Sequence, residues 1–136
     1  MPVHKPKPIV LSMLICDEVI EDRETSKKSL IGLFNNIHSE KIPCVHPRIC
    51  VFSTLTDGKG DCNVALKFVK QDDENQLLSF EAPIKFFDPK QVVELKFEIC
   101  GLVLPEFGDY RFDLYYEQEL LISRKFMVSP IQRTNT

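Results

Sequence analysis

The chain has 136 residues, 43% of them hydrophobic, and its 17 Lys and Arg residues against 20 Asp and Glu residues give a net charge of −3. This length and composition predict one globular domain with a hydrophobic core and argue against a largely disordered chain. The sequence offers no basic stripe for nucleic acid, and no apolar run approaches the roughly 20 residues of a membrane helix. We therefore expect neither nucleic acid nor a membrane as a partner.

The first residues and the cysteines indicate the compartment. Residues 1–5 lack the apolar core of a signal peptide, so we expect a cytoplasmic protein. The five cysteines are odd in number and form no C-x-x-C pair, and a disulfide framework is not expected in a reducing compartment. Cys62 and Cys100 lie in strand-like runs, where each thiol is expected to pack as a small hydrophobic group.

The N-terminal quarter of the chain predicts an arm, a strand and a connection. Residues 1–8 carry Lys-Pro steps typical of a loose, extended arm. Residues 9–16 are apolar on both parities and predict a strand that is covered on both faces. Residues 17–29 are charged and predict a connection, with a short helix over residues 18–28 as the alternative. Gly32 lies inside the next predicted strand and indicates a bulge or a close backbone approach.

The rest of the chain alternates between apolar and polar residues with a period of two, the pattern of strands with one buried face. Turn residues separate these runs, and residues 39–47 predict a longer loop. Pro83 lies on the outward parity, which suits an edge strand or a bulge, whereas Leu78 lies on the inward parity. The predicted strands after the first are residues 30–37, 49–56, 62–68, 78–86, 93–99, 108–117 and 120–128.

The last two runs predict a β-hairpin closed near residues 117–119. On its first strand the residues expected in the core are Tyr110, Phe112, Leu114 and Tyr116, and those expected in water are Arg111, Asp113 and Glu117. On the return strand the inward set is Leu120, Ile122, Phe126 and Val128, and the outward set is Leu121, Ser123, Lys125 and Met127.

About eight strands with regular turns predict an all-β fold, an antiparallel β-sandwich of immunoglobulin-like or related topology. A flattened barrel is the alternative. Gly108-x-Tyr110 before a strand resembles the tyrosine corner of immunoglobulin-like sandwiches, in which the Tyr hydroxyl bonds nearby backbone. We expect a single domain over residues 9–128, followed by a polar tail over residues 129–136.

Several short motifs, spread over residues 9–128, together resemble a family of short bacterial proteins known only as a domain of unknown function. Ser26 departs from the family pattern, which tends to have Gly after the Thr at position 25. The resemblance implies a small all-β protein and supplies no substrate, cofactor or catalytic residue. The motifs that carry it are Cys16-Asp17-x-Val19, Asp22, Thr25, Lys27, Ser29-Leu30-Ile31-Gly32-x-Phe34, Pro43, Pro47, Thr56-Asp57-Gly58-x-Gly60, Phe87-x-Pro89 and Leu104-Pro105-x-x-Gly108-x-Tyr110-x-Phe112.

Acidic residues recur in alternate connections, which emerge at the same end of an antiparallel sheet. Calcium binds six to eight oxygens drawn from several loops, so this end is a candidate metal site, although Asp is also simply a good turn former. The candidate ligands are Asp17, Asp22, Asp57, Asp61 and Asp88.

Cys44-x-His46-x-x-x-Cys50, with His38 as a fourth ligand, is a weaker candidate for zinc, because structural zinc sites usually pair their ligands as C-x-x-C. A Cys44/His46 catalytic dyad has no Asp or Asn beside it in the sequence to orient the histidine.

The sequence therefore favours a non-catalytic protein that needs no cofactor. Tyr115 and Arg111 both point outward and are of the types enriched at interfaces, and Phe86, Phe87 and Phe107 are further aromatic candidates. We expect a protein-interaction or accessory module with an unknown protein partner, and an edge strand makes a homodimer plausible. The alternative is an ion- or ligand-binding β-sandwich that uses the acidic loop end.

Overall fold

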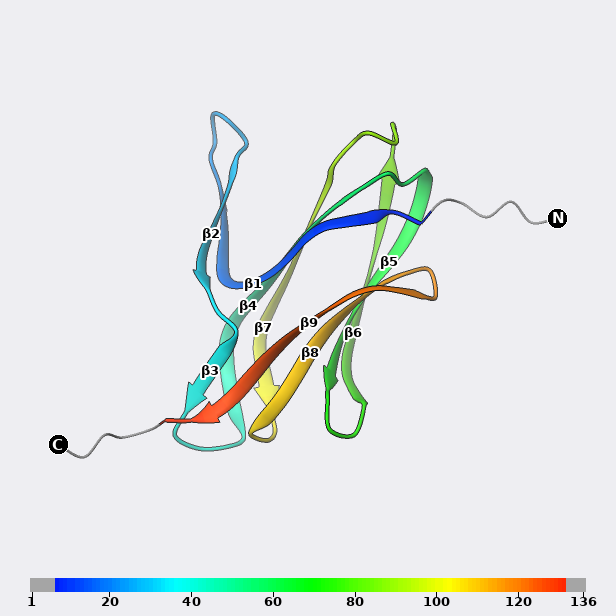
Figure 1. The fold of residues 1–136 in the computed structure, drawn as a ribbon. Helices are drawn as coiled ribbons and strands as arrows, with labels where there is room; N and C mark the ends of the chain where they lie inside the picture. The colour runs from blue at the N-terminus through cyan, green and yellow to red at the C-terminus, as the bar shows by residue number, and fades with distance from the viewer. Residues whose placement is uncertain (1–6, 132–136) are drawn as a thin grey trace.

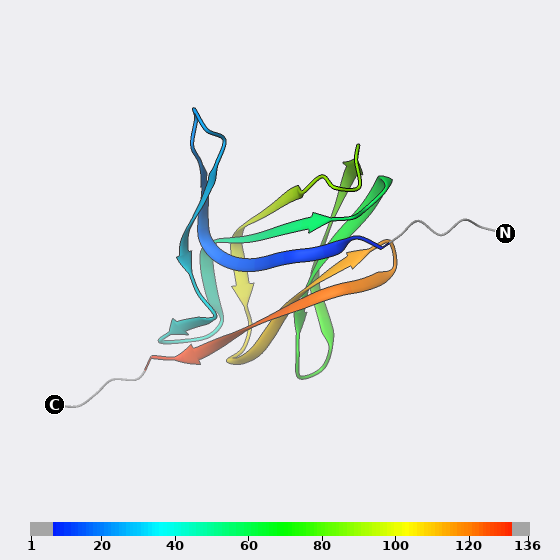
Figure 2. The same cartoon turned by 45° about the horizontal axis from the view of Figure 1, so that its top comes forward.

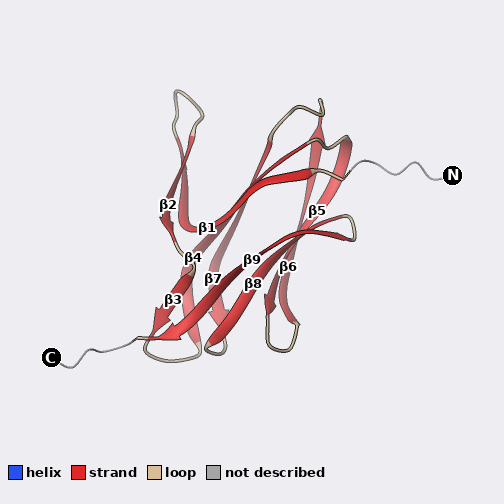
Figure 3. Ribbon diagram, in the orientation of Figure 1, coloured by secondary structure: helices blue, strands red, loops and turns tan. Residues whose placement is uncertain are grey.

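A computed structural model describes residues 7–131. Most of the predicted N-terminal arm (residues 1–6) and of the polar tail (residues 132–136) lie outside these described residues. The described part consists of strands joined by turns and loops, as Figure 3 shows. Residues 7–131 form no helix that could span a membrane.

Residues 7–131 contain nine strands, whereas the sequence predicted about eight. They form two packed sheets, with the orders β2-β1-β4-β7 and β3-β9-β8-β5-β6 (Figure 1; Figure 2). The protein is an all-β sandwich, as predicted. The strands are β1 (Ile9–Glu21), β2 (Lys28–Leu33), β3 (Asn36–Ser39), β4 (Cys44–Thr56), β5 (Gly60–Lys70), β6 (Asn75–Phe86), β7 (Val93–Leu104), β8 (Gly108–Tyr116) and β9 (Glu119–Pro130).

The order of the strands is immunoglobulin-like. β4 pairs with β7 in one sheet, and β5, β8 and β9 are neighbours in the other. These are the positions of strands B and E, and of C, F and G, in immunoglobulin-like sandwiches. All pairings are antiparallel except that of β3 with β9, which is parallel and joins residues 36–39 to residues 127–130. Pro83 is exposed on the edge strand β6, as predicted. Proline has no N–H group and therefore discourages a further strand from pairing with a sheet edge.

The core lies between the sheets and is built by the predicted alternation. On β7 the inward residues Leu95, Phe97 and Ile99 are buried, whereas the charged residues between them are exposed. The core contains an aromatic cluster, with ring centroids of neighbouring side chains 5.1 to 5.8 Å apart. Stacked aromatic side chains bury large apolar areas, so this cluster anchors the sandwich. Its members are Phe68, Tyr110, Phe112 and Phe126.

The predicted tyrosine corner is confirmed. Tyr110 is fully buried at the start of β8, and its hydroxyl donates a hydrogen bond of 2.7 Å to the carbonyl of Glu106. The same oxygen accepts a bond of 3.1 Å from the Glu106 N–H. Burial raises the pKa of the Tyr110 hydroxyl. The side chain therefore fixes the β7–β8 connection against the core.

The prediction of a connection or a helix over residues 17–29 was wrong. β1 continues to Glu21 and pairs with β2 from Cys16 onward, so that only residues 22–27 form the turn. Residues 17–21 of β1 form a two-stranded ribbon with β2, and both faces of this ribbon are near water. A strand exposed on both faces needs no alternation of apolar and polar residues, so its sequence did not predict a strand. Gly32 has φ 72° and lies so close to Asp17 that a Cβ atom would fall 2.3 Å from the Asp17 carboxylate. The predicted close backbone approach is thus confirmed.

Other predicted bounds also changed. β4 begins at Cys44, so the loop predicted over residues 39–47 is shorter. β3 is a separate strand, because the chain crosses from one sheet to the other after β2. β9 extends to Pro130, two residues into the predicted tail.

Two β-bulges lie where the burial of individual residues differs from the predicted alternation. In β6 the extra residue is Leu77, which packs on the core, whereas Leu78 keeps its predicted inward parity opposite Phe68 but is 38% exposed. In β9 the register shifts at Leu121, which packs on the core, and Leu120 is exposed. A bulge adds one residue to one strand and reverses the parity that follows. Cys100 was also expected to pack, but its thiol is exposed on the outer face of β7.

Candidate interaction surface on the five-stranded sheet

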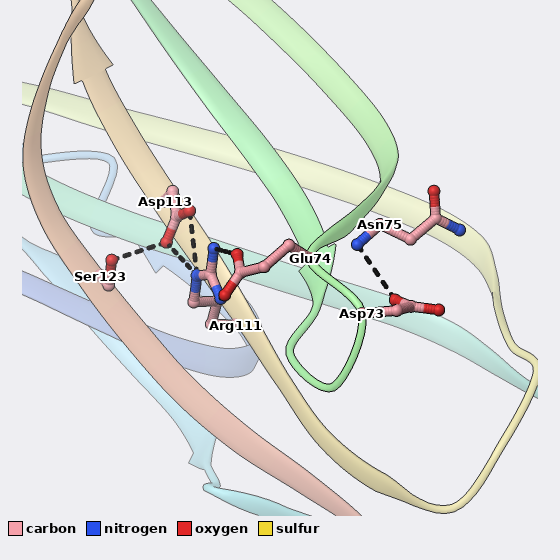
Figure 4. Close-up of polar contacts among 6 residues, drawn as sticks. All are labelled: Asp73, Glu74, Asn75, Arg111, Asp113 and Ser123. Atoms are coloured by element: carbon pink, nitrogen blue, oxygen red, sulfur yellow. Dashed lines mark hydrogen bonds and ion pairs between the residues drawn. The ribbon is translucent and has the colours of Figure 1, made fainter.

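Asp113 was expected in water, but the structure buries it. Only 2% of the residue is exposed, although it lies on the outer face of β8. Its two carboxylate oxygens each accept a 3.0 Å hydrogen bond from Nε of Arg111. Oδ1 accepts a further bond of 2.6 Å from the hydroxyl of Ser123 on β9 (Figure 4). A carboxylate can be buried when its lone pairs are satisfied by charged and polar donors.

The other side of Arg111 is held by the turn between β5 and β6. Nη1 of Arg111 donates to Oε1 of Glu74 at 3.1 Å, and Nη2 bonds Oε2, so the pair is bidentate (Figure 4). The Arg111 guanidinium lowers the pKa of the Glu74 carboxyl, and Glu74 in turn raises the pKa of Arg111. We call Glu74, Arg111, Asp113 and Ser123 the Arg111 clamp. It ties the β5–β6 turn to β8 and β9.

The same turn is ordered by its own side chains. Asp73 Oδ1 accepts a hydrogen bond of 3.1 Å from the backbone N–H of Asn75, the first residue of β6 (Figure 4). Because its Nε, Nη1 and Nη2 atoms are all engaged within the chain, Arg111 acts as a structural side chain. Of the two predicted interaction residues, Tyr115 is thus the one with a side chain available to a partner.

Tyr115 lies on the outer face of β8 and is half-buried. Nζ of Lys67 lies 4.4 Å from the centre of its ring, within the range of a cation–π contact. Directly opposite Tyr115 are Ala65 on β5 and the exposed Leu120 on β9. Opposed residues of antiparallel strands share a face. We call this row of Leu120, Tyr115 and Ala65 the Tyr115 strip.

The other aromatic candidates are dispersed. Phe86 is buried in the core and Phe107 is half-buried, whereas Phe87 is 80% exposed in the β6–β7 loop. Nζ of Lys85 lies 5.1 Å from the Phe87 ring centre. Phe87 is therefore a second exposed aromatic side chain, away from the Tyr115 strip.

The acidic residues of the loop end are partly brought together. The β1–β2, β4–β5 and β6–β7 turns emerge at one end of the molecule, as predicted (Figure 1). The backbone N–H of Asp57 donates to the carbonyl of Pro89 at 2.8 Å, so the turns of Asp57 and Asp88 are adjacent, and Asp61 follows in β5. Asp88 uses Oδ1 to accept a bond of 2.8 Å from the Lys90 N–H.

The other two acidic candidates lie elsewhere. Asp22 is in the β1–β2 turn, where its Oδ1 accepts bonds of 2.9 Å from the N–H groups of Glu24 and Thr25. The Thr25 N–H bond lowers the pKa of Asp22. In both views this turn stands apart from the β6–β7 turn (Figure 1; Figure 2). Asp17 lies within β1 beside Gly32. Within residues 7–131, no three His, Cys, Asp or Glu side chains are arranged to hold a metal ion.

Cys44 and His46 line a shared cleft of about 370 Å³, together with His38 and Asp17. Nε2 of His46 lies 3.5 Å from Oδ1 of Asp17, an orienting carboxylate that the local sequence did not reveal. No hydrogen bond joins Cys44 to His46 in the described part of the chain. Cys50, the third proposed zinc ligand, is buried against β1 instead.

The sequence reasoning passed over Arg124. It pairs with the core residue Phe112 and therefore lies on the inner face of β9, between Ile122 and Phe126. Its Nε atom is buried and has no hydrogen-bond partner within residues 7–131. The signal was an arginine in the inward series Ile122-x-Arg124-x-Phe126-x-Val128, which is otherwise apolar.

Comparison with protein families places the chain. A family of unknown function, DUF6941, matches residues 11–129. The chain belongs to this family. The predicted resemblance to a domain of unknown function is thereby confirmed. A search of curated proteins finds no match to the chain.

Proposed function

We propose that this member of the DUF6941 family is a non-catalytic protein-interaction module that binds a protein partner through the Tyr115 strip. The observation that carries the proposal is Tyr115 itself, a half-buried ring in contact with Lys67 on the outer face of β8, the middle strand of the five-stranded sheet. Tyrosine offers a large contact area with little conformational entropy to lose, which makes it a frequent interface anchor.

The surroundings of the strip support a binding face. Its apolar row crosses three neighbouring strands, β9, β8 and β5, with Leu120 exposed, Tyr115 half-buried and Ala65 buried. The exposed, charged Glu81 of β6 lies opposite Ala65 at one end of it. An apolar centre with a polar rim is the usual anatomy of an interface. The Arg111 clamp adds rigidity, because it joins β8 and β9, two of the three strands of the strip, beside it.

Two further observations favour protein binding, one over catalysis and one over ion binding. Cys44 and His46 share a cleft but form no hydrogen bond with one another in the part of the chain described. The alternative of ion binding at the acidic loop end has weaker support, because Asp22 and Asp88 already use carboxylate oxygens to cap their own turns.

The test uses the immobilised chain to capture proteins from extracts of its own cells, followed by binding of the purified partner. We expect Tyr115→Ala to abolish capture and Phe87→Ala to retain it, since Phe87 is a matched exposed aromatic outside the strip. Equal capture by wild type and Tyr115→Ala would contradict the proposal. Sedimentation of the purified chain separates a second copy from a different protein as the partner.

A further inference from the structure

The side of the sandwich between β1 and β9 holds a small cleft. Its volume is about 170 Å³, and its lining residues are Leu14, Ile15, Leu33, Phe34, Asn35 and Arg124. The first half of β1 and the first half of β9 border this side. β2 pairs only with residues 16–21 of β1, and β3 only with residues 127–130 of β9. The cleft thus lies where β2 ends and the link over residues 34–35 crosses from β1 to β9.

Arg124 is the one charged side chain of this cleft. It projects from the inner face of β9 toward walls that are otherwise apolar apart from Asn35. Within residues 7–131 no carboxylate pairs with it, in contrast to Arg111, whose guanidinium is bonded to two acidic residues. An arginine is charged at every physiological pH, so the cleft carries a fixed positive charge.

The buried Nε–H of Arg124 is the second observation. It has no acceptor in the described chain, and a buried donor without a partner is costly. A guanidinium binds a carboxylate through two parallel hydrogen bonds, one of which can use Nε. The Asn35 side chain has an amide group that can donate a third. An anion with an apolar body would therefore accept the Arg124 hydrogen bond and pack against the apolar walls of the cleft.

We propose that this cleft binds a carboxylate attached to a short apolar chain. A comparable cavity of about 150 Å³ accommodates benzene, so the ligand fits at roughly six non-hydrogen atoms. Butyrate has that size and chemistry. The same carboxylate can come from a free acid or from an acidic side chain of a protein. This site lies on the inner side of the five-stranded sheet and is separate from the Tyr115 strip.

The experiment follows backbone amide shifts by NMR during titration at constant ionic strength. The probes are butyrate, its neutral isostere butyramide, and N-acetyl-aspartate N-methylamide as a blocked acidic residue. We expect butyrate to shift amides of residues 33–35 and 122–126 with millimolar affinity, since so small a ligand has few contacts. Butyramide should bind at least about tenfold more weakly, because it cannot form the charged pair.

Three variants separate the proposal from other causes. Arg124→Gln should abolish the preference for butyrate, and Arg124→Lys should retain part of it because the charge remains. Tyr115→Ala should bind butyrate as wild type does, so that failure here is distinct from failure of the Tyr115 strip. A larger shift with the blocked aspartate than with butyrate assigns the ligand to a protein side chain, and the reverse assigns it to a free acid. The proposal is overturned if neither carboxylate shifts these amides, if butyramide binds equally, or if Arg124→Gln binds unchanged.

Discussion

The hydroxyl of Ser123 donates a 2.6 Å hydrogen bond to the carboxylate of Asp113, which is almost completely buried although it lies on an outer sheet face. The bond joins β8 to β9 by side chains in addition to the backbone ladder. It makes Ser123 one of the two donors that allow a charge to remain buried there, the other being Arg111.

This relationship predicts a graded loss of stability. Asp113→Ala removes the acceptor and leaves the Arg111 and Ser123 donors unpaired, so we expect the free energy of unfolding to fall by about 3 kcal/mol. Ser123→Ala should cost about 1 kcal/mol, because Arg111 still satisfies the carboxylate. Urea unfolding measures both. Ser79→Ala, an exposed serine of β6, is the matched control, and an equal loss in that variant would argue against the clamp.

Glu74 gives the clamp a pH dependence. Its pKa is lowered in the folded protein by Arg111, so its contribution to stability is present above the unfolded value, about 4.3, and is lost as pH falls through the folded pKa. Glu74→Gln should therefore be less stable than wild type at pH 7 and approach it below pH 4. Unfolding by urea across this range measures the gap. Glu81→Gln should show no such convergence, and a constant gap for Glu74→Gln would contradict the assignment.

The hydroxyl of the tyrosine corner contributes to stability separately from the Tyr110 ring. Tyr110→Phe keeps the stacked ring but removes the hydroxyl that bonds both backbone groups of Glu106. We expect a loss of about 1–2 kcal/mol with an unchanged fold, since two backbone groups lose a buried partner. Thermal unfolding checks the size of the loss. Tyr115→Phe serves as control, because the Tyr115 hydroxyl has no comparable role, and equal losses in the two variants would count against the corner.

Substitution of Arg124 is expected to stabilise the protein, in contrast to the substitutions above. Arg124→Met replaces a guanidinium whose Nε lacks a partner by an apolar side chain of similar length, so the free energy of unfolding should rise by about 1 kcal/mol. Lys125→Met, at the neighbouring outward position, should change it by less than about 0.5 kcal/mol. A destabilised Arg124→Met protein would show that the arginine serves packing within the chain.

Calcium tests the acidic loop end. Since the candidate ligands are divided between separate turns, millimolar calcium should leave the melting temperature of the protein unchanged relative to magnesium. A ligand that binds only the folded state must raise that temperature. An increase with calcium that is lost in Asp57→Asn and Asp88→Asn would instead favour the ion-binding alternative.

The alternation of apolar and polar residues was sufficient to predict the sandwich and its core. Phe97 and Phe112 are buried where a period of two requires, and Gly108-x-Tyr110 predicted a real hydrogen bond. The errors arose where the period alone is insufficient. In β9 the extra residue at Leu121 places Leu120 on the outer face, and a bulge leaves little trace in composition.

The candidate site was less predictable, because it depends on contacts between distant segments. In the sequence alone, Asp113 has the parity of a residue that faces water. Its burial involves Arg111, which is also bonded to Glu74 in a turn 39 positions before Asp113. Likewise the pairing of Asp17 with His46 joins β1 to β4. Arg124 could have been predicted as a site residue, because the sequence already shows it as an arginine within an apolar inward series.

The turn of residues 22–27 has a practical use. It is closed by its own hydrogen bonds, from the Asp22 N–H to the Lys27 carbonyl and from the Ser26 N–H to the Asp22 carbonyl. The ribbon that it ends is paired with no strand of the five-stranded sheet. A fluorescent reporter or an epitope inserted between Arg23 and Glu24 would therefore sit remote from both the Tyr115 strip and the Arg124 cleft, and would provide a handle for following either in living cells.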